Sequence, residues 1–420
     1  MKIKAAISKG SITRVHVLTF VDQALFSGAN FLFGVGLIHA FGTTKFAAYG
    51  IGLSAALLLQ SLQRGFNIKL ALIATAEFTE HKRRLLGAHV ALLATCLLLP
   101  GLSYIGLELV GVRESVLDLL AATIACIAIY FQAETNRIFL VKAGAQWKAP
   151  LLTCVTFLAY SGAVCCGYIY LASFRVAMLG ISGIIVLFSA IVIWREIRPD
   201  ILNGVRQLFS VHRGVIGWTT LGTLASSVYA HWPVFLLGIF HPSIYTTAYV
   251  ATRNLLQPLQ ILVRGLDTAD KHHFANLDKD RFGACLRALA RNLLAAGIYC
   301  LPILLFSGAI LRLTYGEQLV EFEAELRLWI FPFAAIGLLL PLESRIYYYK
   351  LERGYSISLL FSSAAVAMAL VPLVIYGNAI GAIVASFLGY SLHAAIAARY
   401  AFKLSQNDKI YSISISREVS

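Results

Sequence analysis

Long apolar runs separated by short polar breaks follow one another along the whole chain. The runs reach about 20 residues or more, the length at which an α-helix crosses a roughly 30 Å hydrocarbon layer. In such a layer every backbone polar group needs an internal partner, which favours helices as the spanning elements. The pattern predicts twelve spans, over residues 15–41, 46–75, 85–109, 115–140, 148–172, 176–195, 214–240, 244–267, 283–309, 323–349, 355–376 and 378–403.

An internal repeat divides these spans into two halves. The second span, FAAYGIGLSAALLLQSLQRGFN, returns about 200 residues later as AYVATRNLLQPLQILVRGLD. The matches at one constant offset include Ala48 with Ala248, Tyr49 with Tyr249, Gln60 with Gln260, and Arg64 with Arg264. A second match relates Arg137 and Lys142 to Arg345 and Lys350. We therefore expect a six-helix bundle over 1–195, a linker over 196–213, a second bundle over 214–403 and a tail over 404–420.

Composition places the chain among membrane proteins. Of its 420 residues, 59% are hydrophobic and only 13% are charged, with a mean hydropathy of +0.75. Soluble domains carry about 25% charged residues, and a water-soluble fold could not cover so much apolar side chain. The predicted fold class is an all-α membrane protein with about twelve transmembrane helices.

Neither a cofactor nor a metal site is predicted. The seven cysteines fall inside apolar runs, and none has a C-x-x-C or Cys/His ligand spacing, so no disulfide framework or zinc site is indicated. The N-terminus begins basic and then apolar, like a signal peptide, but the apolar stretch meets Asp22 and Gln23 and continues past any small-residue cleavage site. We expect a retained first span.

The basic residues outside the spans gather on one side. Loops on the side of the N-terminus carry most of them, whereas the opposite side has Lys45, Arg113, Arg175 and Arg312. The positive-inside rule then predicts both termini in the cytoplasm. These loops account for most of the net charge of +14, and no aromatic-interleaved basic patch indicates a nucleic-acid partner.

Two halves with six spans each begin on the same side of the membrane. They are then parallel repeats about an axis along the membrane normal, with a substrate path at their interface. Small residues at four-residue spacing favour close helix packing. In the twelfth span Gly381, Ala385 and Gly389 have this spacing, and the first span contributes the small residues Gly34 and Gly36.

Nine basic residues remain inside the predicted spans, where a cation costs about 2.5–3.5 kcal/mol at the bilayer centre even on the mildest scale. They are Arg64, Lys69, Arg137, Arg253, Arg264, Arg287, Arg291, Arg327 and Arg345. Lys69, Arg137 and Arg345 lie at span ends and can reach the interface. Glu134, Glu323 and Glu343 lie close enough in sequence to pair with Arg137, Arg327 and Arg345.

The remaining cations predict a polar, cationic face. Arg253 lies nine residues into its span, roughly 13 Å along the helix axis, and Gln257, Gln260 and Arg264 follow it on one face. Arg287 with Arg291, and Gln60 with Arg64, add pairs one turn apart. We expect these side chains to line a cavity that holds a phosphate group, because the guanidinium fork donates two hydrogen bonds. The alternative is that they form ion pairs between helices.

The first span has a polar stripe of its own, with Gln23, Ser27 and Asn30 on one face. Asp22 is the one acid deep in that span. Two roles are open for it: binding a proton or sodium ion that drives transport, or pairing with one of the arginines. His231, beside Pro233, is expected to be a core residue at a kink, and His39 to lie near an outer interface.

The stretches VDQALFSGANFLFGVGL, FAAYGIGLSAALLLQSLQRG and YTTAYVATRNLLQPLQILVRGLDT resemble the polysaccharide transporter family of Wzx-type oligosaccharide flippases. This family belongs to the multidrug/oligosaccharidyl-lipid/polysaccharide (MOP) flippase superfamily. The resemblance implies a MATE-like fold, with two six-helix bundles in a V around a central cavity. It also implies a flippase that moves a polyprenyl-diphosphate-linked oligosaccharide across the bacterial inner membrane by alternating access. The implied partners are this glycolipid, the bilayer, and a glycan polymerase and glycosyltransferases.

Two other functions stay open. A cation-coupled multidrug extruder on the same fold would favour acids and aromatic residues in the cavity. A membrane enzyme, such as a glycan polymerase or acyltransferase, would need a large outward loop or a catalytic motif. His273 and Asp278 have the H-x-x-x-x-D acyltransferase spacing, which two residues support only weakly. No phosphate-binding glycine loop indicates direct ATP use.

Overall fold

The computed structural model describes residues 9–72, 75–145, 147–170, 173–210, 213–275, 281–348 and 351–418. For some residues in these ranges, including Arg64 and Arg264, it describes the backbone and not the side chain. Every element in this part of the chain is helical. The helices are α1 (Lys9–Leu72), α2 (Thr75–Leu109), α3 (Glu114–Lys142), α4 (Lys148–Tyr170), α5 (Phe174–Glu196), α6 (Ile201–Ser210), α7 (Arg213–Phe240), α8 (Ser243–Ala275), α9 (Arg281–Tyr315), η1 (Glu317–Phe322), α10 (Glu323–Leu328), α11 (Ile330–Tyr348) and α12 (Glu352–Glu418).

Two of these helices fold back on themselves and count as two spans each. In α1 the backbone leaves the helical region at Gly42, with φ 80°, a left-handed conformation that glycine adopts without strain. Phe33 and Tyr49, on either side of that turn, pack edge to face. In α12 the break is at Asn378, with φ 43°, and Tyr355 packs against Tyr400 across it. Both turns fall where the hydropathy pattern predicts a break.

Nine helical stretches among the described residues are long and apolar enough to cross a membrane. Two of them, Val21–Gln63 and Arg353–Leu404, contain the turns just described and are 43 and 52 residues long, about twice one crossing. Helix α8, which carries Arg253, Gln257 and Gln260, is not among these nine stretches but coincides with the predicted span 244–267. The described helices correspond in order to the twelve predicted spans, with α10 and α11 in the place of the tenth, and the predicted all-α membrane fold is confirmed.

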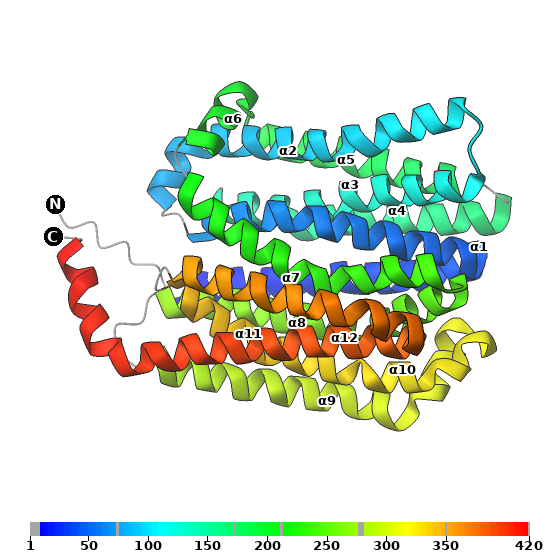
Figure 1. Cartoon of the computed structure of the whole chain (residues 1–420). Helices are drawn as coiled ribbons and strands as arrows, with labels where there is room; N and C mark the ends of the chain where they lie inside the picture. Colours follow the sequence, from blue (N-terminus) through cyan, green and yellow to red (C-terminus); the bar gives the residue numbers. More distant parts are fainter. Residues whose placement is uncertain are drawn as a thin grey trace.

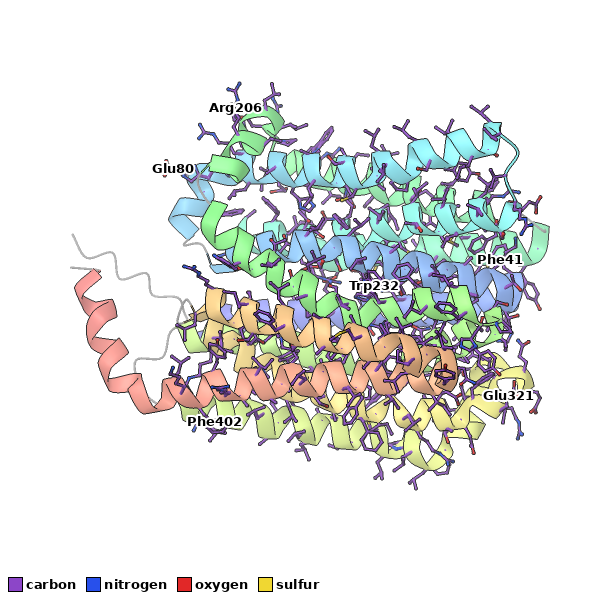
Figure 2. All side chains as sticks on the ribbon, in the orientation of Figure 1. Phe41, Glu80, Arg206, Trp232, Glu321 and Phe402 are labelled. Atoms are coloured by element: carbon purple, nitrogen blue, oxygen red, sulfur yellow. The ribbon has the colours of Figure 1, made fainter. Side chains whose placement is uncertain are left out.

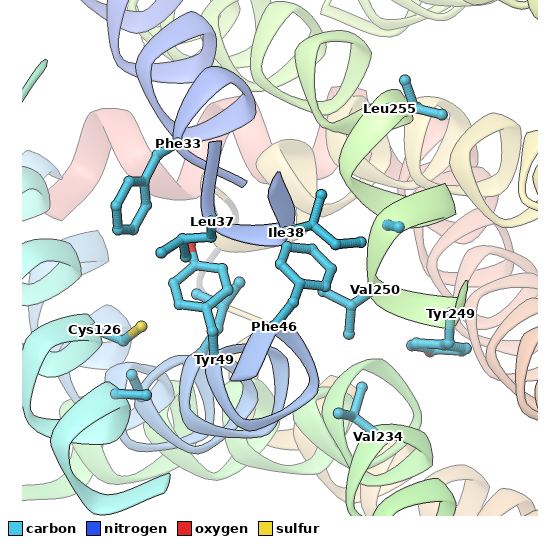
Figure 3. Packing of buried hydrophobic residues seen from close by; sticks show 14 of the residues in the cluster. Phe33, Leu37, Ile38, Phe46, Tyr49, Cys126, Val234, Tyr249, Val250 and Leu255 are labelled. Atoms are coloured by element: carbon cyan, nitrogen blue, oxygen red, sulfur yellow. The ribbon is translucent and has the colours of Figure 1, made fainter. Parts of the chain in front are cut away.

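The helices form two groups packed side by side (Figure 1). Helices α1 to α5 lie together in one group, and α7 to α12 lie together in the other. Apolar side chains from α1, α7 and α8 fill the seam between them, including Phe46, Tyr49, Val234 and Val250 (Figure 3). The core is therefore continuous from one half to the other.

The repeat-related helices meet at this seam. A Cβ on Gly50 of α1 would lie 2.5 Å from a methyl group of Val250 on α8, the residue that matches it in the repeat. Gly34 likewise leaves room for Asn254 of α8, and Gly389 of α12 for the ring of Tyr229 on α7. The predicted role of Gly34 and Gly389 in close helix packing is confirmed.

The predicted linker over 196–213 contains a helix that the hydropathy pattern missed. Helix α6 is short and amphipathic, and it packs on the start of α2. Its contact depends on small residues: a Cβ on Gly87 would lie 2.0 Å from the carbonyl oxygen of Asp200, and one on Gly204 would lie 2.3 Å from that of Arg84. Helix α2 also begins ten residues before the predicted span, because the charged segment 75–84 continues the helix.

Charged side chains gather at the two ends of the bundle. Glu80 and Arg206 lie at one end and Glu321 at the other (Figure 2). At the end predicted to face outward, basic residues lie within ion-pair distance of acids. The pairs are Lys45 with Asp118, Arg175 with Asp118 and Glu114, Arg312 with Glu317, and Arg327 with Glu323. The last of these was predicted from the spacing of four residues.

Candidate functional site

A small pocket lies in the seam between the two halves. It is lined by the second segment of α1, by Val234 of α7 and by the outer half of α8, including Val250, Arg253, Asn254 and Gln257. The cavity has a volume of about 20 Å³, which is room for about one water molecule and far below the roughly 300–1,000 Å³ usual for small-molecule sites. The structure thus joins Arg253 and Gln257, both predicted site residues, in one place.

Arg253 is the charged residue of this pocket. It lies eleven residues into α8, roughly 15 Å along the helix axis from the first residue, and is half-buried. Its Nη1 donates to the carbonyl oxygen of Ala230 on α7 at 3.1 Å, and its guanidinium lies 5.7 Å from the ring centre of Trp329. Within the described residues no carboxylate lies within ion-pair distance of it. The remaining guanidinium donors can therefore serve an anion in the pocket.

Asn254 is a site residue that the sequence-based reasoning missed. Its side-chain amide donates to the Tyr315 hydroxyl on α9 at 3.1 Å and, across the seam, to the Phe31 carbonyl on α1 at 3.4 Å. Asn254 follows Arg253 directly in the sequence, so it lies off the helical face that Arg253 shares with Gln257 and Gln260. The spacing argument therefore did not include it. Trp329 was missed as well, because it lies 76 positions from Arg253 in the sequence.

Hydrogen bonds between the halves close the seam toward both ends of the molecule. Near the α1 turn, Thr247 donates to the carbonyl of Thr43 at 2.8 Å, and His39 contacts the carbonyl of Thr314 at 2.9 Å. Toward the opposite end, Thr223 of α7 donates to the carbonyl of Ser61 at 2.8 Å. The expected open V is thus replaced, in this structure, by two bundles in contact on either side of a closed pocket.

A second pocket lies within the first bundle, between α1, α3, α4 and α5. Asp22 is buried there and forms an ion pair with Arg137, and it accepts a hydrogen bond from Thr153 at 2.5 Å. The Arg137 guanidinium also lies 4.6 Å from the ring centre of Phe26. Of the two roles open for Asp22, the structure contains the pairing with an arginine. Arg137 pairs here with an acid from another helix, where the sequence had indicated Glu134.

The other predicted site residues are dispersed. Asn30 is buried in the first bundle, where its side-chain oxygen accepts hydrogen bonds from Tyr130 and Tyr160. The Gln60 amide donates to the Tyr130 carbonyl. Gln23 and Gln260 are half-buried outside the lining of either pocket described above, and Arg287 and Arg291 are exposed on α9. The side chains of Arg64 and Arg264 lie outside the described residues.

Two remaining sequence expectations concern basic residues of the second bundle. Arg345 is buried and donates to the carbonyl of Ala401 at 3.0 Å, while Glu343 contacts His393 and Tyr355. His231 is buried in α7, two residues before the helix-internal Pro233, as expected of a core residue.

Comparison with known proteins gives the fold. No protein-family model matches the sequence, and no curated protein matches it significantly. Solved structures do match. The lipid II flippase MurJ in an inward closed conformation has a TM-score of 0.67 at 14% identity, over 97% of this chain and 93% of that chain.

Two further solved transporters of the MOP superfamily are similar over the same extent. An outward-facing multidrug resistance MATE transporter has a TM-score of 0.65 at 15% identity, over 95% of this chain and 96% of that chain. A transporter from Pyrococcus furiosus has a TM-score of 0.63 at 15% identity, with the same coverage. The chain therefore has the MATE-like, all-α membrane fold of these transporters.

Proposed function

We propose that this protein is a flippase that moves a polyprenyl-diphosphate-linked oligosaccharide, a polysaccharide or O-antigen repeat unit, across the cytoplasmic membrane by alternating access. One observation carries the proposal: Arg253 lines the pocket between the halves, with no described carboxylate to neutralise it. A cation kept unpaired in a membrane protein is costly, which favours an anionic cargo as its partner.

The diphosphate of the cargo is the group that Arg253 suits. A guanidinium stays charged and can donate two parallel hydrogen bonds to phosphate oxygens. Its bond to the Ala230 carbonyl and its contact with Trp329 fix its direction, and Gln257 supplies an amide donor in the same pocket. In this closed form the pocket has room for little more than a water molecule, so the halves must separate to admit the diphosphate and the glycan, while the polyprenyl tail stays in lipid.

The remaining predicted residues take supporting roles in this proposal. Arg64, Arg264, Arg287 and Arg291 attract the anionic headgroup from the cytoplasmic side, and the amides of Gln23, Asn30, Gln60 and Gln260 meet the sugars once the seam opens. In this proposal a proton binds to Asp22 and neutralises its carboxylate, which releases Arg137 from the ion pair. This step would couple transport to a proton gradient. A glycan polymerase and glycosyltransferases are the proposed functional partners.

A cation-coupled multidrug extruder is the second candidate. The likeness to a multidrug resistance MATE transporter and the buried Asp22 favour it, whereas an arginine in the pocket disfavours cationic drugs. The Pyrococcus furiosus transporter is described as having a binding pocket of reversed polarity that suggests a different function. Pocket charge can therefore differ between proteins of this fold, and here it favours an anion. An acyltransferase or polymerase ranks third, because two residues at one spacing are its support; Asp278 and the side chain of His273 lie outside the described residues.

The test is the leaflet distribution of polyprenyl-linked glycan in host cells with wild type, Arg253→Ala or Arg253→Lys at matched protein levels. Arg327→Ala is the control, because Arg327 pairs with Glu323 away from the pocket. We expect glycolipid to accumulate on the cytoplasmic face with Arg253→Ala and less so with Arg253→Lys. An unchanged distribution, together with efflux of a cationic dye that is lost in Asp22→Asn, would instead establish the extruder.

A further inference from the structure

A cluster of titratable side chains lies in the second bundle, apart from both pockets. His393 of the second α12 segment is 3% exposed, and its Nε2 lies 3.0 Å from a carboxylate oxygen of Glu343 on α11. Tyr355, from the first α12 segment, bonds both partners: its hydroxyl donates to Glu343 at 2.9 Å and lies 2.6 Å from His393 Nε2. The hydroxyl of Tyr229 on α7 contacts the other ring nitrogen, Nδ1.

The surroundings of this cluster are apolar. Tyr355 and Tyr229 are at most 1% exposed, and the cluster borders a buried core that includes Leu342, Ile346 and Leu359. A histidine beside a carboxylate in such a place is a frequent carrier of a transported or coupling proton. Other titratable groups on the surrounding helices include Tyr390 against Tyr229, Tyr400 against Tyr355, Arg345 on the Ala401 carbonyl, Arg353 over Trp218, His231 on α7 and Cys285 on α9.

The first bundle contains a neutral counterpart. At the offset that matches Arg137 with Arg345, Thr135 matches Glu343. Thr135 also contacts a buried histidine, His89, whose ring bonds to Thr135 and Gln63. The second bundle thus has a carboxylate where the first has a hydroxyl, and packing alone does not require that difference.

The cluster is connected to the Arg253 pocket through α7. The carbonyl of Tyr229 accepts from Ser386 at 3.0 Å, and Ser386 bonds to Tyr249 on α8, one turn before Arg253. The next carbonyl along α7, that of Ala230, accepts from Arg253 itself. The carbonyl that orients Arg253 therefore lies one residue along α7 from Tyr229, whose hydroxyl contacts His393.

We propose that Glu343 and His393 form a proton-binding site in the second bundle, and that its protonation acts on the Arg253 pocket through Tyr229. The action on cargo rests on the proposed function, whereas the binding of the proton does not. With a neutral ring, Nε2 donates to Glu343 and Nδ1 accepts from the Tyr229 hydroxyl. A proton from the cytoplasmic side adds at Nδ1, and the ring, now a cation beside the Glu343 carboxylate, donates from both nitrogens. Tyr229 must then accept at this contact and turn its own hydrogen elsewhere, which loosens its fit between α7 and α12.

Proton uptake by the full chain in lipid nanodiscs, without cargo, tests the site. The pH is lowered from about 8 to about 5, the range in which histidine titrates, and the protons bound per chain are counted by difference titration. We expect His393→Gln to bind about one proton fewer than wild type. Glu343→Gln keeps the histidine but should lose the same proton, because the carboxylate no longer stabilises the imidazolium cation. His89→Gln is the matched control and should bind as many protons as wild type.

Equal uptake by wild type and His393→Gln would overturn the site, and this comparison suffices even if Glu343→Gln does not fold. Coupling is tested with inorganic pyrophosphate as the probe. The affinity for pyrophosphate should change several-fold more with pH in wild type than in Tyr229→Phe. Because pyrophosphate ionises identically in both measurements, the comparison cancels that contribution. An identical pH dependence in the two proteins would refute the coupling. Normal proton uptake without pyrophosphate binding at either pH would leave the proton site standing and contradict the proposed function.

Discussion

Two arginines of this protein each line a small pocket between helices, but only one of them is paired with a described carboxylate. Arg137 faces a pocket inside one bundle and is paired there with the buried Asp22, over the ring of Phe26. Arg253 faces a pocket between bundles, where its polar partner is a backbone carbonyl and no described carboxylate neutralises it. The difference separates a charge used to hold helices together from a charge kept available for a ligand.

The physical reason is the cost of an unpaired charge. Inside a rigid bundle a cation needs an anion in place at all times, because nothing else enters to stabilise it. At a seam that opens during transport, water and cargo can supply that partner. The comparison therefore predicts that changes at Arg137 affect stability first, and changes at Arg253 affect ligand binding first.

The largest expected effect follows from Arg137→Met. It leaves the carboxylate of Asp22 buried with the Thr153 hydroxyl as its remaining hydrogen-bond donor among the described residues, and breaking a buried pair in this way costs about 3–5 kcal/mol. We expect a marked drop in the thermal unfolding temperature of the detergent-solubilised protein. The double variant Asp22→Leu/Arg137→Met removes both charges and should recover most of the loss. A single variant as stable as wild type would contradict the structural role of the pair.

Arg253→Met should have the opposite profile. The chain loses one hydrogen bond to a carbonyl and one ring contact, but it also loses the cost of an unpaired cation in the membrane, so stability should fall less than in Arg137→Met. Binding of a polyprenyl diphosphate loses a charge-assisted interaction of about 1.5–3 kcal/mol, which is roughly a 10- to 150-fold weaker affinity. Titration in nanodiscs measures it, with Arg327→Met as the control. A stability loss as large as that of Arg137→Met would mean that Arg253 is structural too.

The sequence predicted much of the fold because its signals are local. Apolar runs of membrane-spanning length mark the helices, and the breaks at Gly42 and Asn378 were placed correctly by short polar segments. Helix α6 was missed because an amphipathic helix outside the membrane has no long apolar run.

The site was predicted less completely, because contacts between distant segments leave no local signal. Spacing on one helix face joined Arg253 to Gln257, and the structure keeps them together. The same reasoning could not foresee that Asp22 pairs with Arg137, 115 positions away, or that Trp329 lies over Arg253. Nor could it distinguish Asn30, whose polar atoms bond within its own bundle, from residues that line the seam.

A smaller effect is expected from the hydrogen bonds that close the seam. Thr247→Val removes the bond to Thr43 near the α1 turn, and Thr223→Val removes the bond to Ser61 toward the other end. One hydrogen bond is worth about 0.5–1.5 kcal/mol, so each change should shift the ratio of outward-open to inward-open molecules by roughly 2- to 10-fold. Thr247→Val should favour the outward-open form and Thr223→Val the inward-open form.

Single-molecule distance measurements between the two bundles report these populations. Probes placed on α1 and α4, which flank the Asp22 pocket inside one bundle, serve as the internal control and should not respond to either change. Shifts in the same direction for both variants would show that the two bonds do not close opposite ends of the Arg253 pocket.

The smallest expected effect is that of Trp329→Phe, and its two contributions to stability have opposite signs. The indole N–H of Trp329 is buried without a hydrogen-bond partner in the part of the chain that the structure describes, so phenylalanine removes an unsatisfied donor, and this gain offsets part of the cost of the cavity that the smaller ring leaves. A phenyl ring attracts the Arg253 guanidinium less well than an indole, so diphosphate affinity should fall by about twofold. Arg253→Met/Trp329→Phe isolates the coupling: in that background the ring change should no longer alter affinity. An equal loss in both backgrounds would mean that Trp329 supports the pocket by packing and not by orienting Arg253.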